Sequence, residues 1–116
     1  IRLFNEQEFF ECHDELEEIW AESFGEQKQF LQGLIQASVA LFHFGNENFG
    51  GARKLYVSSS QKLAGFPDEF LGIDLLRFKA EFAECFRELL EAGDVYPSDI
   101  ELREERIPQL HFVGQD

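Results

Sequence analysis

Four glycines divide this chain at intervals that match the length of a helix. They are Gly25, Gly45, Gly65 and Gly93. Each follows a segment whose apolar residues recur with the period of an α-helix, and glycine commonly stands just past a helix end. The spacing predicts four principal helices, and the short links between the first three make neighbouring helices antiparallel. We therefore expect an all-α fold, a compact four- to five-helix antiparallel bundle in which residues 1–116 form a single helical domain.

The first predicted helix begins at Asn5. Its side chain is a favourable N-cap, Glu8 stands at the third helical position, and Phe4 and Phe9 occupy the two places of a hydrophobic staple. On a helical wheel the inner face of this helix holds six residues. They are Phe9, Cys12, His13, Leu16, Ile19 and Trp20.

The second helix, about residues 26–44, is apolar around most of its circumference. A helix of this kind lies at the centre of a fold, so we expect it to be the most buried, with Leu34 and Ile35 shielded from water. Gly33 would let a neighbouring helix approach closely, because glycine has no side chain to hold the two backbones apart.

The remaining elements are predicted from caps and stops. The third helix runs from an Asn46 cap to about Ala64, and the fourth runs from an Asp74 cap to Ala92. The tail after Pro97 combines helical and extended signals, so it is a short C-terminal helix or an arm lying across the bundle.

Composition narrows the class of protein. The chain has 116 residues, of which 44% are hydrophobic. This is enough to form one hydrophobic core without disulfides or structural metals. Cys12 and Cys85 lie far apart and have no CxxC partner, which favours a reducing compartment and two small buried side chains. No apolar run approaches the length of a membrane span. We expect a cytoplasmic protein, or a plastid stromal one if the source is eukaryotic.

The charge balance excludes two classes of partner. Acids outnumber bases 23 to 10, and a net charge of −13 repels both nucleic acid and anionic membrane surfaces. One outer ridge of the first helix is entirely acidic. It consists of Glu8, Glu11, Glu15, Glu18 and Glu22. A solvated face is the favoured interpretation and a docking strip for a basic protein partner is the alternative, while a homodimer that avoids this ridge stays possible.

A polar seam is predicted between the first two helices. His13 lies on the inner face, and Glu17 is one turn later, within reach of its imidazole. The only polar stripe of the second helix is formed by Gln29, Gln32, Gln36 and His43. A buried structural hydrogen-bond network is the favoured interpretation, with no cofactor. The alternative is a divalent metal held by His13, Glu17 and His43, because imidazole and carboxylate are ligands of zinc and non-haem iron.

The start of the third helix is a further candidate site. Its free amides and Arg53 could bind a small anion, but the segment lacks the phosphate-loop pattern. Close packing of Gly50 and Gly51 against the second helix is the favoured use of these glycines.

Several of these segments together resemble the domain of unknown function 309 family. The segments are FFECHDELEEIW at 9–20, FLQGLIQ at 30–36, His43 followed by Gly45-Asn46, and GARKL at 51–55. The similarity covers about residues 4–64. It implies a small all-helical fold found in bacteria, archaea and plastids, with no established activity. Asp14 departs from the pattern, which more often has Glu there.

Two functions follow from these residues. The favoured one is a non-catalytic binding or regulatory module, and the alternative is a metal-binding protein or metal-dependent hydrolase. The candidate binding or seam residues are His13, Glu17, Trp20, Gln32, Gln36, His43, Asn46 and Arg53.

Overall fold

The computed structural model describes residues 2–92 and 100–114. The helices in these ranges are α1 (Arg2–Asn5), α2 (Phe9–Ala21), α3 (Gly25–Gly45), α4 (Phe49–Leu63) and α5 (Leu75–Glu91). A hairpin of β1 (Glu69–Phe70) and β2 (Ile73–Asp74) precedes α5, and a 3₁₀ turn, η1 (Glu104–Arg106), interrupts the tail. The predicted all-helical fold is confirmed, with four long helices and one very small antiparallel hairpin among the described residues.

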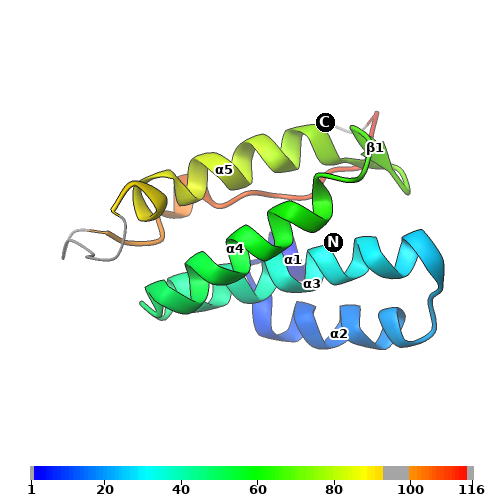
Figure 1. Ribbon diagram of the computed structural model, residues 1–116, viewed down its shortest axis with the longest axis horizontal. Helices are drawn as coiled ribbons and strands as arrows, with labels where there is room; N and C mark the ends of the chain where they lie inside the picture. Colours follow the sequence, from blue (N-terminus) through cyan, green and yellow to red (C-terminus); the bar gives the residue numbers. More distant parts are fainter. Residues whose placement is uncertain (1, 93–99, 115–116) are drawn as a thin grey trace.

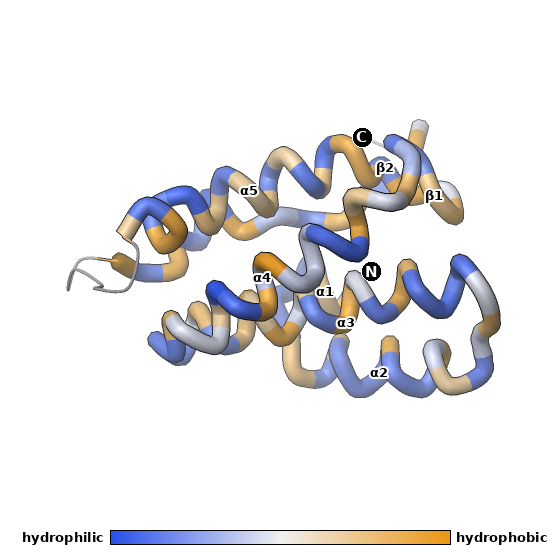
Figure 2. Tube along the Cα trace, in the orientation of Figure 1, coloured by the Kyte–Doolittle hydropathy of each residue, from blue (hydrophilic) through white to orange (hydrophobic). Residues whose placement is uncertain are grey.

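The long helices alternate in direction along the chain (Figure 1), and for α2, α3 and α4 this confirms the antiparallel arrangement predicted from their short links. α3 packs between α2 and α4, and α5 runs back along the other side of α4. Hydrophobic and hydrophilic residues alternate along each helix (Figure 2), as expected where one face is buried. Within the described ranges, no helix is both long and apolar enough to cross a membrane.

The core is built from aromatic rings around α3. Leu34 and Ile35 are only 3% and 5% exposed, so the prediction that the second helix is buried is confirmed. The phenylalanine stripe of α5 closes the core: the rings of Phe82 and Phe86 meet edge to face at 5.1 Å, and Tyr56 of α4 stacks on Phe86 at 4.7 Å. Such ring pairs add about 0.5–1.5 kcal/mol each beyond the area they bury.

Gly33 sets the distance between α3 and α4. A Cβ atom at this position would lie 2.8 Å from Cδ2 of Leu63, closer than side chains pack. Leu63 is fully buried, so it has little room to move away. The predicted use of Gly33 as a point of close helix approach is therefore confirmed.

The predicted start of the first helix is wrong. Asn5 does not cap α2 but ends α1, and Gln7, with a positive φ of 65°, separates the two helices. The N-cap of α2 is Glu8, whose side chain makes no capping bond. The Asn5 side chain instead pairs with Leu110 in the tail, a partner that no local pattern could indicate.

The predicted cap of the third helix is also displaced. Asn46 is the C-cap residue of α3, and Glu47 after it takes a left-handed φ of 62°. Asn48 therefore becomes the N-cap of α4, and its side chain accepts a hydrogen bond from the Gly51 amide. The Asp74 cap of α5 is confirmed, because its carboxylate accepts a bond from the Arg77 amide.

The described part of the tail is the predicted arm. It runs back beside α5 to the hairpin (Figure 1), where Phe112 pairs with Ile73. Arg106 donates to the Glu88 carboxylate of α5 at 2.8 Å, and this hydrogen bond is the main reason that the pKa of Glu88 is lowered. In the sequence, Ser98 and Glu101 are spaced as a capping box for a short tail helix, but Ser98 lies outside the described residues.

Replacing Asn5 by alanine should loosen the tail. Asn5 Nδ2 donates to the Leu110 carbonyl at 2.8 Å, and the Leu110 amide donates back to Oδ1 at 2.7 Å. The variant leaves two partly buried backbone groups unpaired, so the free energy of unfolding should fall by about 1–3 kcal/mol in urea titrations. Asn46→Ala is the matched control at an exposed position and should change it by less than about 0.5 kcal/mol. Equal losses in the two variants would contradict this role of Asn5.

Candidate functional site

His13 lies in the second turn of α2 between two carboxylates. Its Nε2 atom is 3.1 Å from Oε1 of Glu17, which confirms the predicted contact one turn apart. Its Nδ1 atom is 3.4 Å from Oδ1 of Asp14. This nitrogen is sealed from solvent and makes no hydrogen bond to any described residue. The His13 side chain is 23% exposed, so it lies at the edge of the core and not within it.

The inner face of α2 is narrower than the helical wheel predicted. Phe9 and Cys12 are buried, and Leu16 is partly buried. Ile19 is 45% exposed, so its placement on the inner face was wrong. The reason is that α2 is an outer helix: α3 is the one long helix that covers it, and it covers one side only.

The polar stripe of α3 does not form one continuous seam facing His13. Gln36 turns toward α4, where its Oε1 atom accepts a hydrogen bond from the Ser58 hydroxyl at 2.8 Å. His43 Nδ1 lies 3.4 Å from Nδ2 of Asn48, and Gln32 faces a separate cavity. The stripe faces both α2 and α4, so some of its side chains contact α2 and others contact α4. The sequence alone could not show which helix each side chain contacts.

His13 and His43 both line a small apolar cavity of about 140 Å³, which we call the His13 cavity. Phe9, Phe10, Val39 and Phe42 form the rest of its wall. Glu17 does not line this cavity. Its carboxylate belongs to a different group, in which potential ligand atoms of His13, Asp14 and Glu17 all lie within 4.8 Å of one another. The structure thus pairs His13 and Glu17 with Asp14, where the sequence predicted His43.

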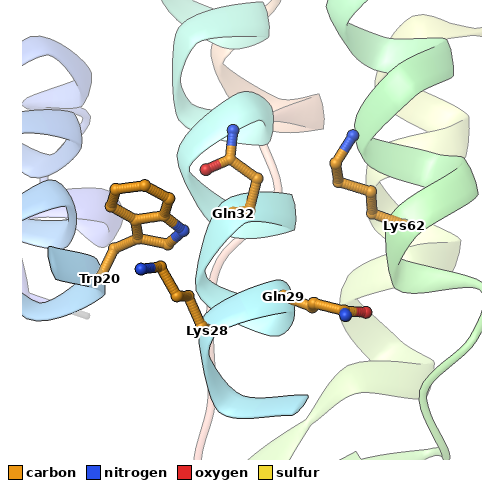
Figure 3. Close-up of a pocket in the computed structure, with 5 residues that line it drawn as sticks. All are labelled: Trp20, Lys28, Gln29, Gln32 and Lys62. Atoms are coloured by element: carbon orange, nitrogen blue, oxygen red, sulfur yellow. The ribbon is translucent and has the colours of Figure 1, made fainter. Parts of the chain in front are cut away.

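A second cavity, of about 340 Å³, lies over α3 between α2 and α4 (Figure 3). We call it the Trp20 cavity. It is lined by Trp20 of α2, by Lys28, Gln29 and Gln32 of α3, and by Lys62 of α4. Two of these residues, Trp20 and Gln32, were candidates from the sequence. The two lysines were missed, although Lys28 stands one turn before Gln32 on the same face of α3.

Both lysines of the Trp20 cavity have neighbours that position them. The Lys28 ammonium lies 4.1 Å from the centre of the Trp20 ring, within the range of a cation–π interaction. The Lys62 ammonium donates to the Ser58 hydroxyl at 3.3 Å, and that hydroxyl donates in turn to Gln36. Gln36 therefore supports the wall of the cavity through Ser58 and Lys62 without lining it.

The predicted anion site at the start of the third helix lies apart from both cavities. Asn46 is exposed, Arg53 is partly buried, and neither lines the His13 cavity or the Trp20 cavity. The expected packing of Gly50 and Gly51 against α3 is wrong. A Cβ on Gly50 would meet nothing within 4 Å, and one on Gly51 would meet the Asn48 side chain at 2.7 Å. Gly51 makes room for the cap of its own helix.

The two cysteines are free and buried, as predicted. Burial raises the pKa of the Cys12 thiol, and burial raises the pKa of Cys85 to about 12. Both side chains are therefore thiols at neutral pH, which makes them poor nucleophiles. Cys12 accepts a weak hydrogen bond from Ser38 of α3 at 3.8 Å, so it packs toward the core while His13 faces the groove.

Comparison with known proteins finds one family model and two relatives to which this chain is similar. Residues 1–55 match the model of a family described as Domain of unknown function (DUF309), which confirms the resemblance seen in the sequence. Uncharacterized protein YpuF of Bacillus subtilis (strain 168) is 33% identical over 107 residues, which cover 89% of this chain and 61% of that protein. An uncharacterized protein of Aquifex aeolicus (strain VF5) is 32% identical over 82 residues, covering 70% of this chain and 25% of that protein. The chain spans less than two thirds of either relative.

His13→Ala should destabilise the fold moderately. The His13 ring packs 5.8 Å from the ring of Phe10, and losing a ring that is mostly buried should lower the free energy of unfolding by about 1–2 kcal/mol. Glu18→Ala, on the exposed ridge of the same helix, should leave stability unchanged or raise it slightly, because it removes a like charge. Urea titration of both variants measures the difference. A His13→Ala variant as stable as the parent would show that this ring contributes nothing to packing.

Proposed function

We propose that this chain, whose residues 1–55 carry the DUF309 domain, is a non-catalytic binding module that takes a small molecule in the Trp20 cavity. We place it in a reducing compartment, in line with its two free, buried cysteines. The alternative of a metal-binding protein rests on a different group of residues and is treated separately below.

The composition of the cavity wall carries the proposal. An indole ring and the methylene stems of two lysines offer apolar contact, while two amides and two ammonium groups offer hydrogen bonds. A few polar groups on a mostly apolar wall are typical of small-molecule sites. None of the lining residues is a carboxylate, imidazole, thiol or hydroxyl, so acid–base chemistry in this cavity would fall to its two lysines alone, and the groups present are better suited to recognition.

The position of the cavity supports a site that exists before the ligand arrives. Its walls come from three helices whose packing is fixed elsewhere: Lys62 is adjacent to Leu63, which is held against Gly33. A site on packed helices loses little conformational entropy on binding compared with one on loops.

A fragment titration tests the proposal. In ¹H–¹⁵N spectra of the full chain, a set of small fragments of mixed charge should shift the indole signal of Trp20, the only tryptophan in the sequence, and the side-chain amide signals of Gln29 and Gln32. Trp20→Ala removes the indole wall and should weaken these fragments about tenfold or more. Asn46→Ala, at an exposed residue outside the cavity, is the control and should leave binding unchanged. Fragments that shift only residues around His43, or none at all, would contradict the proposal.

A divalent metal site is the second candidate, favoured by one observation. Ligand atoms of His13, Asp14 and Glu17 lie within 4.8 Å of one another. Three atoms bound to one ion at about 2.0–2.2 Å are separated by roughly 3–4 Å, so small side-chain rotations would bring this group into range. Three protein ligands would also leave a coordination position for water, which is what a metal-dependent hydrolase requires. His43, the third ligand expected from the sequence, is replaced in this group by Asp14.

The metal candidate predicts binding that depends on His13. Calorimetric titration of chelator-treated, untagged protein with Zn²⁺ should give about one ion per chain, and His13→Ala should abolish it. Bound metal should also raise the melting temperature of the parent but not of the variant, because an ion stabilises only the state that holds it. Glu18→Gln tests whether ridge acids alone bind the ion, and it should behave like the parent. Equal binding by the parent and His13→Ala would rule this site out.

A further inference from the structure

We infer that the molecule bound in the Trp20 cavity is a small organic anion with an apolar, ring-sized body. The inference rests on the proposed function, because it names the class of ligand for the same cavity. It is carried by the charge of the lining residues and by the size and wall of the cavity.

The charge of the cavity opposes the charge of the chain. The sequence has 23 acidic and 10 basic residues, yet both ionised residues that line the cavity are lysines. Lys28 lies over the Trp20 ring from one side, and Lys62 stands across the cavity on α4 (Figure 3). Each ammonium has three N–H donors, so donors remain after the contacts to Trp20 and Ser58. The cavity is therefore a local cationic site in an acidic protein, suited to one carboxylate or similar anion.

The amides add donors that an anion can use. Gln29 extends from α3 toward α4, and Gln32 lies between Trp20 and Lys62 (Figure 3). Each side-chain NH₂ group can donate to an anionic oxygen, and charge-assisted hydrogen bonds of this kind are stronger than neutral ones. A cationic ligand would meet two ammonium groups instead and would be repelled.

Size and surroundings limit the anion to a compact one. A volume of about 340 Å³ is at the low end of ligand sites, and the indole and lysine stems favour an apolar body. Glu18 and Glu22, exposed on either side of Trp20 in the sequence, continue the acidic ridge of α2. An extended polyanion would meet these like charges along α2, whereas a small anion can be confined to the cavity beside Lys28 and Lys62.

A matched series of three probes tests the ligand class. Benzoate, benzamide and benzylamine have the same ring and similar size but carry charges of −1, 0 and +1. In spectra of the full chain at about 0.15 M salt, benzoate should shift the Trp20 indole signal and bind at least about threefold more tightly than benzamide. This is the preference that ion pairs with the half-buried Lys28 and the exposed Lys62 supply. Benzylamine should bind most weakly of the three.

Two lysine variants show whether the preference comes from the cavity. Lys62→Gln keeps the length of the side chain and removes its charge, so benzoate should lose most of its advantage over benzamide. Lys54→Gln makes the same change at an exposed position of α4 outside the cavity and should leave the advantage intact.

The outcomes separate this inference from the function on which it rests. If benzamide shifts the Trp20 signal as readily as benzoate, or if Lys62→Gln leaves the preference unchanged, the cavity still binds a small molecule but the anion inference is overturned. If neither the three probes nor the fragment set shifts Trp20, Gln29 or Gln32, the proposed function itself fails.

Discussion

The burial of α3 is the constraint on which the rest of the structure depends. Neighbours cover this helix on more than one side, and the contact between Gly33 and Leu63 brings α4 close to it. The one polar stripe of α3 consequently falls in the groove between α2 and α4. The Trp20 cavity lies along this groove near the N-terminal end of α3, and the His13 cavity lies between α2 and α3 near the C-terminal end of α3.

The elements of the fold were predictable because their signals are local. Glycine stops and helical periodicity indicated four long helices, and the all-round apolarity of residues 26–44 indicated which of them is central. The true starts of α2 at Phe9 and of α4 at Phe49 were not predictable. Asn5 fits an N-cap in the sequence, but the tail offers it two hydrogen bonds, and the link before α4 contains two asparagines of equal capping ability.

The contacts of the candidate sites were likewise predictable where they are local and unpredictable where they join different helices. The pair of His13 and Glu17 was predictable because residues one turn apart on a helix are neighbours whatever surrounds them. The hydrogen bond between Ser58 and Gln36 depends on which helices flank α3 and how they are rotated. The same is true of the cavity that Trp20 and Lys62 both line. A single sequence holds no signal for that rotation. Asp14 was missed for another reason: consecutive residues of a helix project in different directions, yet its exposed side chain brings Oδ1 to 3.4 Å from Nδ1 of His13.

The pairing of Asn5 with Leu110 also bears on the order in which the molecule is completed during synthesis. The partners are 105 positions apart, and Phe4 packs against Phe78 of α5 at 5.6 Å. The antiparallel helices α2, α3 and α4 make mostly local contacts and can associate as soon as they leave the ribosome. α1 has to wait for α5 and the tail, because Phe78 and Leu110 lie there. Although it precedes α2 in the chain, α1 therefore reaches its final place only after the elements that follow it have been made.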